Sequence, residues 1–202
     1  MAKIGWIGLG QMGTPMVENL LKGSVDVTVY NRSFDKTLPL VEKGAKNTKN
    51  VEEIFEQNDI IFFMISNYSA ALEILNENVL SKIKGKKIVN MSTISPTESK
   101  AVGKLVIENN GKYIEAPVSG SVGAATAGVL LILVGGNEAD TKDLYSIFDI
   151  LGSKTYYFGE LGKATGAKLV LNSLLGIFGE AYSEVLLLAQ NFGIDTETIV
   201  NA

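Results

Sequence analysis

The feature that most constrains the fold is a glycine-rich turn between an apolar strand and an amphipathic helix near the start of the chain. Residues Lys3 to Gly8 form an apolar run too short for a helix, and the glycines that follow end it. From Gln11 to Lys22 apolar residues recur at helical spacing, and a second apolar segment, Val25 to Tyr30, comes next. This order predicts a βαβ unit, whose strands are parallel because a crossover helix joins them.

Strands and helices continue to alternate as far as Phe158. Further helices are expected over residues 34–43, 51–57, 70–80, 96–109 and 138–150, and further strands over 60–65, 87–90, 113–117, 130–134 and 155–158. Repeated alternation is typical of an α/β domain with helices on both faces of the sheet. We therefore predict a doubly wound, mostly parallel Rossmann sheet.

A different pattern begins after Gly159. A helical stretch from about Ala164 to Phe192 is longer than any before it, and Asp195 to Thr198 has the composition of the first turn of another helix. The sequence therefore predicts a Rossmann domain over residues 1–162. Residues 163–202 are expected to form a long interdomain helix and the start of an all-α second domain.

Two missing residue types narrow the possible chemistry. The chain contains no His and no Cys, which excludes a Ser-His-Asp triad, a thiolate nucleophile and a zinc site built on these ligands. The Asp and Glu residues are scattered, so no metal site is expected. Proton transfer would then rely on Lys, Asp, Glu, Tyr or solvent.

Charge and hydropathy bear on partners and location. The net charge of −4 provides no strong positive field, which argues against nucleic-acid binding. The N-terminus lacks the pattern of a secretory signal, and polar residues such as Glu180 interrupt the most apolar segment, Leu169 to Ala189. We therefore expect a cytoplasmic protein with no membrane partner.

The glycine turn has the spacing GxGxxG in the context that dinucleotide binding requires. Gly8 allows a tight turn, Gly10 allows a pyrophosphate to approach the backbone, and Gly13 allows close packing of the helix. The start of the helix then offers free N–H groups to the phosphates. The predicted cofactor contacts in this motif are Gly8, Leu9, Gly10, Gln11, Met12 and Gly13.

The residues after the second strand bear on the choice between NAD and NADP. An NAD-binding protein usually carries an acidic residue here to hold the ribose hydroxyls, whereas this chain has Asn31, Arg32 and Ser33. These side chains offer donors and a cation to a 2′-phosphate, so the sequence favours NADP(H) over NAD(H).

Two later segments carry polar groups in small or apolar surroundings. Ser119, Gly120 and Ser121 follow a predicted strand, and their accessible N–H groups suit a carboxylate ligand as well as an ordinary turn. Lys168 and Asn172 lie four residues apart on the long helix. The apolar neighbours of Lys168 favour a partly buried ammonium with a lowered pKa, although an isolated helical Lys is more often solvated.

Taken together, these segments resemble the β-hydroxyacid dehydrogenases. The segments GWIGLGQMGTPMVENL, NRS, EAPVSGS, LLILVGG and GAKLVLN occur in this family's order and at its separations. The resemblance covers essentially the whole chain. It is greatest for the NADPH-dependent branch, the glyoxylate/succinic semialdehyde reductases, and also includes 3-hydroxyisobutyrate dehydrogenase.

The resemblance implies hydride transfer between nicotinamide and a small hydroxy acid or its aldehyde or keto acid. Lys168 falls on the family's catalytic lysine, and Asn172 would orient the substrate or the lysine. Ser119, Gly120 and Ser121 fall on its substrate-carboxylate loop. Met64, Ile65 and Thr93 fall on positions that the family uses for the cofactor.

Two alternative functions stay open. Imine reductases share the GLGxMG turn and a helical second domain but do not depend on a lysine at this position, so Lys168 argues against them. A nonenzymatic dinucleotide-binding interaction module is the other alternative. It gains weight because family members continue for about another half-domain of helices, which makes this chain resemble a fragment.

The long helix also bears on assembly. Between Leu169 and Leu188 apolar residues occupy more than one face, and Gly176 and Gly179 would allow another backbone to approach closely. We expect an exposed apolar face and a homodimer formed through this helix about a twofold axis.

Overall fold

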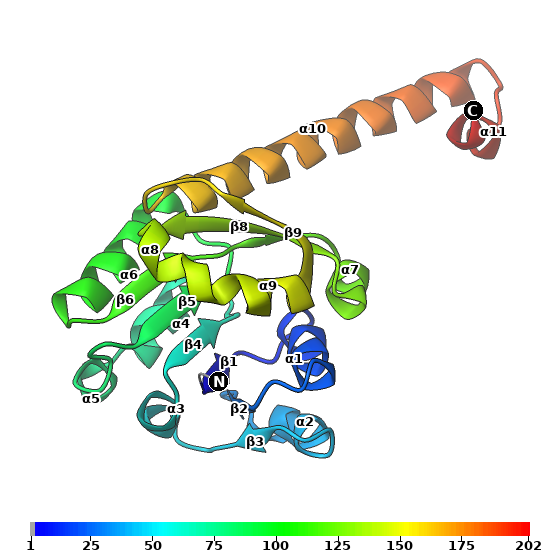
Figure 1. Ribbon diagram of the computed structural model, residues 1–202. Helices are drawn as coiled ribbons and strands as arrows, with labels where there is room; N and C mark the ends of the chain where they lie inside the picture. The colour runs from blue at the N-terminus through cyan, green and yellow to red at the C-terminus, as the bar shows by residue number, and fades with distance from the viewer. Residues whose placement is uncertain (1–2) are drawn as a thin grey trace. The chain divides into compact units, whose positions relative to one another are not determined.

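A computed structural model describes residues 3–202 (Figure 1). The chain divides into two compact units, one ending at Lys168 and the other running from Leu169 to Ala202. The strands are β1 (Ile4–Ile7), β2 (Val27–Tyr30), β3 (Lys46–Asn47), β4 (Ile60–Phe63), β5 (Lys87–Asn90), β6 (Lys112–Glu115), β7 (Val118–Ser119), β8 (Leu130–Gly136) and β9 (Gly152–Tyr157).

Short and long helices connect these strands. The α-helices are α1 (Gly13–Lys22), α2 (Leu38–Val41), α3 (Val51–Gln57), α4 (Tyr68–Ile74), α5 (Glu77–Leu80), α6 (Pro96–Glu108), α7 (Val122–Ala127), α8 (Glu138–Thr141), α9 (Tyr145–Leu151), α10 (Lys163–Asn191) and α11 (Thr196–Asn201). Two 3₁₀ helices, η1 (Phe34–Thr37) and η2 (Lys142–Leu144), complete the set over residues 3–202.

The sheet confirms the predicted doubly wound, mostly parallel fold. Its strand order is β3-β2-β1-β4-β5-β6-β8-β7, and β9 pairs with β8. Strands β1 to β6 pair in parallel with one another, whereas β8 runs antiparallel to both β6 and β7 and parallel to β9. The order reverses between β1 and β4, so the carboxyl ends of these two strands form the switch point where ligands bind in such sheets.

Two apolar cores cover the two faces of this sheet. One core packs Met16 and Leu20 of α1 and Phe148 of α9 against the strands, and the other packs Phe55 of α3 and Val102 of α6. Figure 1 shows α1, α2 and α7 on one side of the strands and α3, α5 and α6 on the other. Burial on both faces explains why β4 reads as a continuous apolar run.

Several predicted helix boundaries were wrong. The expected helix over 70–80 divides into α4 and α5, because the Asn76 side chain accepts a hydrogen bond from the Val79 N–H at 3.1 Å and caps a new helix. The expected helix over 34–43 divides into η1 and α2. Residues 118–127 hold β7 and α7 where only a loop was predicted, because Ser121 caps α7 and β8 pairs with β7.

The long helix α10 lies close to its predicted bounds. Its 29 residues are long and apolar enough to cross a membrane by length and composition alone, a property shared with core helices of soluble proteins. In the second unit many large apolar side chains of α10 are exposed, among them Leu175, Ile177 and Phe178 at 61–64%. The expectation of an exposed apolar helix is therefore confirmed, while the dimer stays a prediction.

Candidate functional site

The turn between β1 and α1 depends on glycine at two positions. Gly8 has a φ of +103°, and a Cβ built on it would overlap the Met64 carbonyl oxygen of the neighbouring strand's loop. A Cβ on Gly13 would overlap the Gly8 carbonyl oxygen, and its nearest side-chain atom would be Nε1 of Trp6 at 3.2 Å. A Cβ built on Gly10 would meet no atom within 4 Å, so the space beside this residue is open.

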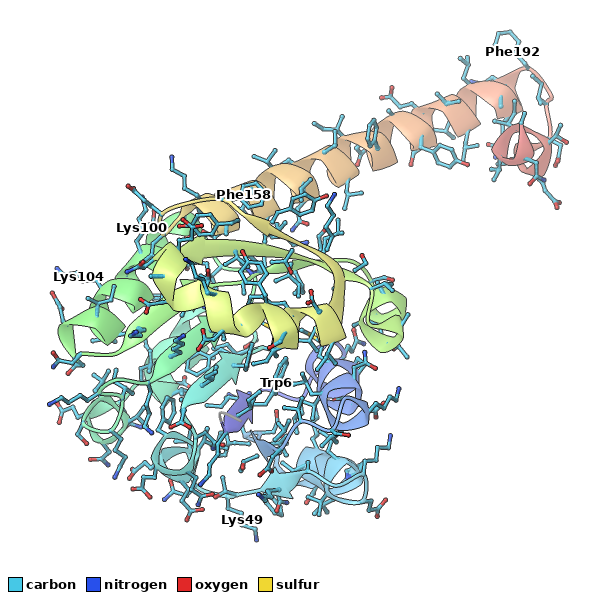
Figure 2. The ribbon with its side chains drawn as sticks, in the orientation of Figure 1. Trp6, Lys49, Lys100, Lys104, Phe158 and Phe192 are labelled. Carbon is cyan, nitrogen blue, oxygen red and sulfur yellow. The ribbon has the colours of Figure 1, made fainter. Side chains whose placement is uncertain are left out.

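Trp6 supports this turn from inside the sheet. Its ring is fully buried and stacks on Phe62 with centroids 5.3 Å apart. Figure 2 labels Trp6 beside β1. Its indole N–H donates to the Gly8 carbonyl oxygen at 3.0 Å. The strand β1 thus fixes the first glycine through a side chain as well as through the backbone.

The N-terminus of α1 follows directly after this turn. In the described part of the chain no side chain caps this ten-residue helix, and Met12 occupies its N-cap position. The first N–H groups of a helix lack partners within it, and the helix dipole makes this end positive. Together with the open backbone at Gly10, this end suits a phosphate or pyrophosphate.

A pocket of about 510 Å³ opens at the carboxyl ends of β1, β2 and β4. Thr93 does not line this pocket and is exposed after the buried Ser92. The predicted cofactor residues that do line it are Gly8, Leu9, Gly10, Gln11, Met12, Gly13, Asn31, Arg32, Ser33, Met64 and Ile65.

The polar rim of this pocket contains residues that the sequence analysis missed. Lys36 adds a second cation beside Arg32, four residues later on η1, and Glu73 adds a carboxylate from α4. Among the described residues neither Arg32 nor Lys36 forms an ion pair. Lys36 follows Arg32 by only four residues, and this closeness in sequence is the signal by which the second cation could have been found.

Asn31 holds the pocket wall together. Its Oδ1 accepts from the Leu9 N–H at 2.9 Å, and its Nδ2 donates to the Ser33 carbonyl oxygen at 2.9 Å. The side chain therefore ties the glycine turn to the loop after β2. This use of both amide atoms leaves Arg32 and Ser33 as the freer groups for a ligand.

A buried polar chain supports the Met64–Ile65 side of the pocket. The Ile65 N–H donates to Ser92 Oγ at 2.9 Å, and the Ser92 N–H donates to Asn90 Oδ1 at 3.0 Å. Asn90 Nδ2 in turn donates to the Tyr113 hydroxyl at 2.9 Å. Burial raises the pKa of Tyr113 far above its usual value of 10.0, which keeps this hydroxyl neutral.

The predicted carboxylate loop lies outside the pocket. Ser119 ends β7, Gly120 has a φ of +144°, and the Ser121 hydroxyl accepts from the Ala124 N–H at 3.4 Å as the cap of α7. None of the three lines the 510 Å³ pocket. Their role toward a substrate stays a prediction.

Lys168 is buried on α10, at 8% exposure. Desolvation lowers its pKa from the ordinary value of 10.5, and within residues 3–202 no acidic side chain pairs with it. A buried ammonium with a lowered pKa can give up its proton more readily than a surface lysine. Asn172 lies one helical turn further along the chain, is exposed and belongs to the second unit, so its role also stays a prediction.

Over residues 3–202 no three His, Cys, Asp or Glu side chains come together in a way that would hold an ion. The site therefore combines a pocket for a dinucleotide with a separate buried lysine.

Comparisons with known proteins agree with this arrangement. Residues 3–159 match the NAD binding domain of 6-phosphogluconate dehydrogenase. The chain is 35% identical over 202 residues to glyoxylate/succinic semialdehyde reductase 1 of Arabidopsis thaliana, covering 98% of this chain and 70% of that protein. The chloroplastic reductase 2 of the same plant is 34% identical, with 98% of this chain and 56% of that protein covered.

Another relative has a different kind of name. The human cytokine-like nuclear factor N-PAC is 34% identical over 202 residues, which cover 98% of this chain and 36% of that protein. The chain thus spans a little over a third to about 70% of the length of these relatives.

Solved structures share the fold over the whole chain. The Mycobacterium tuberculosis 3-hydroxyisobutyrate dehydrogenase has a TM-score of 0.91 and 25% identity, with 100% of this chain and 71% of that chain covered. Psf3, in complex with NADP+ and 2-OPP, has a TM-score of 0.91 and 26% identity, with 98% and 72% covered. The matched region of the first structure includes α10, so this helix has a counterpart in a known dehydrogenase.

Proposed function

Since the chain belongs to the β-hydroxyacid dehydrogenase family, with the NAD binding domain of 6-phosphogluconate dehydrogenase at residues 3–159, we propose that it is an NADP(H)-dependent oxidoreductase of small hydroxy acids or their aldehydes and keto acids. One observation carries this proposal: the chain combines a pocket that suits a dinucleotide with a buried lysine, Lys168, that could transfer a proton.

The residues present fit a nicotinamide dinucleotide. Gly10 and the uncapped start of α1 would face the pyrophosphate, and the apolar Met64 and Ile65 would lie against the flat rings of the cofactor. The bound cofactor supplies or accepts the hydride. The protein's own contribution is to hold the substrate, exclude water and move one proton.

NADP(H) is favoured over NAD(H) by the charges around the end of β2. Arg32 and Lys36 line the pocket with Ser33 between them in sequence, and no acidic side chain occupies residues 31–33. Two cations and a hydroxyl suit a 2′-phosphate, which a carboxylate at this position would repel. The NADP+ named with Psf3 supports the same preference by analogy.

Lys168 is proposed as the general acid in reduction and the general base in oxidation. Its ammonium would protonate the substrate oxygen as negative charge develops there, and its lowered pKa makes this transfer easier at neutral pH. Asn172 would orient the substrate or the lysine. Ser119, Gly120 and Ser121 would bind the substrate carboxylate through hydroxyl and N–H groups. Glyoxylate, succinic semialdehyde and 3-hydroxyisobutyrate are the substrates to test first, because relatives are named for them.

Turnover of NADPH with glyoxylate or succinic semialdehyde tests this proposal. Lys168→Ala is compared with Lys163→Ala, because Lys163 is an exposed lysine on the same helix. We expect the first variant to lose about 10²- to 10⁴-fold in kcat while NADPH affinity stays near that of the wild type, and the second to retain activity. Near-normal turnover in Lys168→Ala would refute the assignment.

A noncatalytic dinucleotide-binding module is the second candidate function, favoured by the similarity to N-PAC, which is named as a nuclear factor and not as an enzyme. It predicts that NADPH binds but no hydroxy or oxo acid turns over, whether or not Lys168 is present. The same assay therefore separates the two candidates.

We also propose a homodimer formed through residues 169–191 and a cytoplasmic location. The exposed apolar side chains of that part of α10 support the first. Fractionation of cells with an antibody to the chain tests the second.

A further inference from the structure

Glu115 is a carboxylate with no exposed surface at the end of β6. Its Oε1 accepts from the Gly162 N–H at 2.5 Å and from the Thr165 hydroxyl at 3.4 Å, and its Oε2 accepts from the Thr165 N–H at 3.3 Å. Within residues 3–202 no Lys or Arg pairs with it. The partners of this buried charge are therefore the groups at the beginning of α10.

A carboxylate in this position has a clear physical effect on the helix. The first N–H groups of α10 have no partners within the helix, and the helix dipole is positive at this end. Glu115 satisfies two of these N–H groups from a strand 47 and 50 residues earlier in the chain. The first turn of α10 is thereby fixed to the sheet.

The neighbouring residues leave space for this contact. A Cβ built on Gly135 would lie 2.9 Å from Glu115 Oε2 and 3.0 Å from the Ala164 Cβ. Ala164 and Thr165 are themselves buried. Glycine at 135 therefore permits the carboxylate and the helix to approach each other.

The contact joins two segments that matter for the proposed reaction. Glu115 stands four residues before Ser119 on one continuous segment, and Thr165 stands three residues before Lys168. At 1.5 Å of rise per residue, Lys168 follows Thr165 by only about 4.5 Å along the helix axis. One side chain thus links the strand that leads to the candidate carboxylate loop with the turn that precedes the candidate acid.

We propose that Glu115 is a positioning residue that anchors the first turn of α10 and so holds the Lys168 ammonium in its buried place relative to the Ser119–Ser121 loop. The proposal rests on the proposed function for the catalytic role of Lys168. The anchoring itself is independent of that function and can be measured in the chain without a substrate.

Glu115→Gln is the main variant, because it keeps the size of the side chain and replaces one acceptor oxygen with a donor. Whichever oxygen is replaced, that donor would face a backbone N–H, that of Gly162 or that of Thr165, so at least one hydrogen bond is lost. Glu98→Gln is the matched control. Glu98 also serves a helix start, since its Oε2 accepts from the Ser95 N–H at 2.8 Å, but that helix is α6.

Three measurements report the effect. Hydrogen exchange at the Gly162 and Thr165 amides should become about tenfold faster in Glu115→Gln, as expected when a hydrogen bond opens. Acetylation of Lys168, followed by mass spectrometry relative to Lys163, should become about tenfold faster at neutral pH, and its pH midpoint should shift as burial changes. NADPH affinity should stay within about twofold, because Glu115 does not line the pocket.

Turnover provides the functional readout. In Glu115→Gln, kcat should fall about 10- to 100-fold with NADPH affinity retained, the size expected for a misplaced catalytic group. Glu98→Gln should change none of these quantities. If Glu115→Gln does not fold, Gly135→Ala serves in its place, because the added methyl group displaces the carboxylate without removing its charge.

The outcomes separate this inference from the proposed function. Unchanged amide exchange and Lys168 reactivity in both Glu115→Gln and Gly135→Ala would overturn the anchoring role. Altered reactivity with normal turnover, while Lys168→Ala abolishes turnover, would overturn the positioning role. Normal turnover in Lys168→Ala would instead overturn the proposed function, and exchange and reactivity would still decide whether Glu115 anchors the helix.

Discussion

Substitution by alanine at two glycines of the same turn should have different effects, a loss of stability at Gly13 and a loss of cofactor binding at Gly10. A Cβ at Gly13 would overlap the Gly8 carbonyl oxygen and lie 3.1 Å from its carbonyl carbon, whereas a Cβ at Gly10 meets no atom within 4 Å. Gly13→Ala should therefore damage the fold. Gly10→Ala should leave the fold intact and obstruct only a ligand that approaches the backbone there.

The magnitudes follow from these surroundings. Overlap with backbone that cannot rotate away costs about 3 kcal/mol, and Ala in place of Gly at the first residue of α1 returns at most about 1 kcal/mol, the value for a helix interior. A net loss of about 2 kcal/mol lowers Tm by about 4–8 °C in a chain of this size. Gly10→Ala should shift the free energy of unfolding by less than about 0.5 kcal/mol. Its NADPH affinity should nevertheless fall at least about tenfold, or 1.4 kcal/mol.

Thermal unfolding by circular dichroism and NADPH titration by fluorescence measure the two effects separately. Gly123→Ala is the control for Gly10→Ala, because a Cβ there meets only Ser121 Oγ, at an ordinary contact distance of 3.5 Å, and Gly123 lies outside the pocket. Wild-type NADPH affinity in Gly10→Ala would show that the turn does not hold the pyrophosphate. An unchanged Tm in Gly13→Ala would refute the packing argument itself.

Three further predictions concern charge, pH and assembly. Arg32→Ala should weaken NADPH binding by about 1–3 kcal/mol with little effect on NADH, and equal losses in calorimetric titrations of both would contradict the 2′-phosphate assignment. Because burial lowers the pKa of Lys168, the unfolded chain binds more protons between that pKa and 10.5, so stability should rise with pH through this interval. Lys168→Met should flatten that rise in urea titrations, and an identical pH dependence in the variant would rule out this origin. The chain should sediment as a dimer at micromolar concentration and as a monomer after Phe178→Glu, whereas a monomeric wild type would refute the helix-mediated dimer.

The sequence by itself determined the fold class and most of the dinucleotide pocket. Apolar runs such as Ile60–Phe63 and helical repeats such as Gly13–Lys22 are local patterns, and their alternation leaves a doubly wound sheet as the economical arrangement. The glycine turn and the residues after β2 are equally local. For that reason eleven of the twelve predicted cofactor residues line one pocket.

Helix boundaries and short elements were harder to predict, because weak local signals compete there with side-chain capping. Asn76 and Ser121 begin helices through single hydrogen bonds to backbone N–H groups three residues later. Asn and Ser are common in loops as well as at helix starts, so the sequence alone does not mark these two residues as caps. The pairing of β7 with β8 likewise depends on how the chain returns across the sheet.

Only the tertiary structure decided how distant residues support the site. The sequence suggested Asn31 as a ligand for a 2′-phosphate, whereas its side chain ties Leu9 to Ser33. Nothing in the sequence around Glu115 indicates that it caps a helix beginning 47 residues later. For Lys168 the sequence left both a buried and a solvated side chain open, and the fold shows that it is buried. The physical reason is that hydrogen-bond partners and desolvation are set by residues far away in sequence, whereas strands, helices and glycine turns follow from their neighbours along the chain.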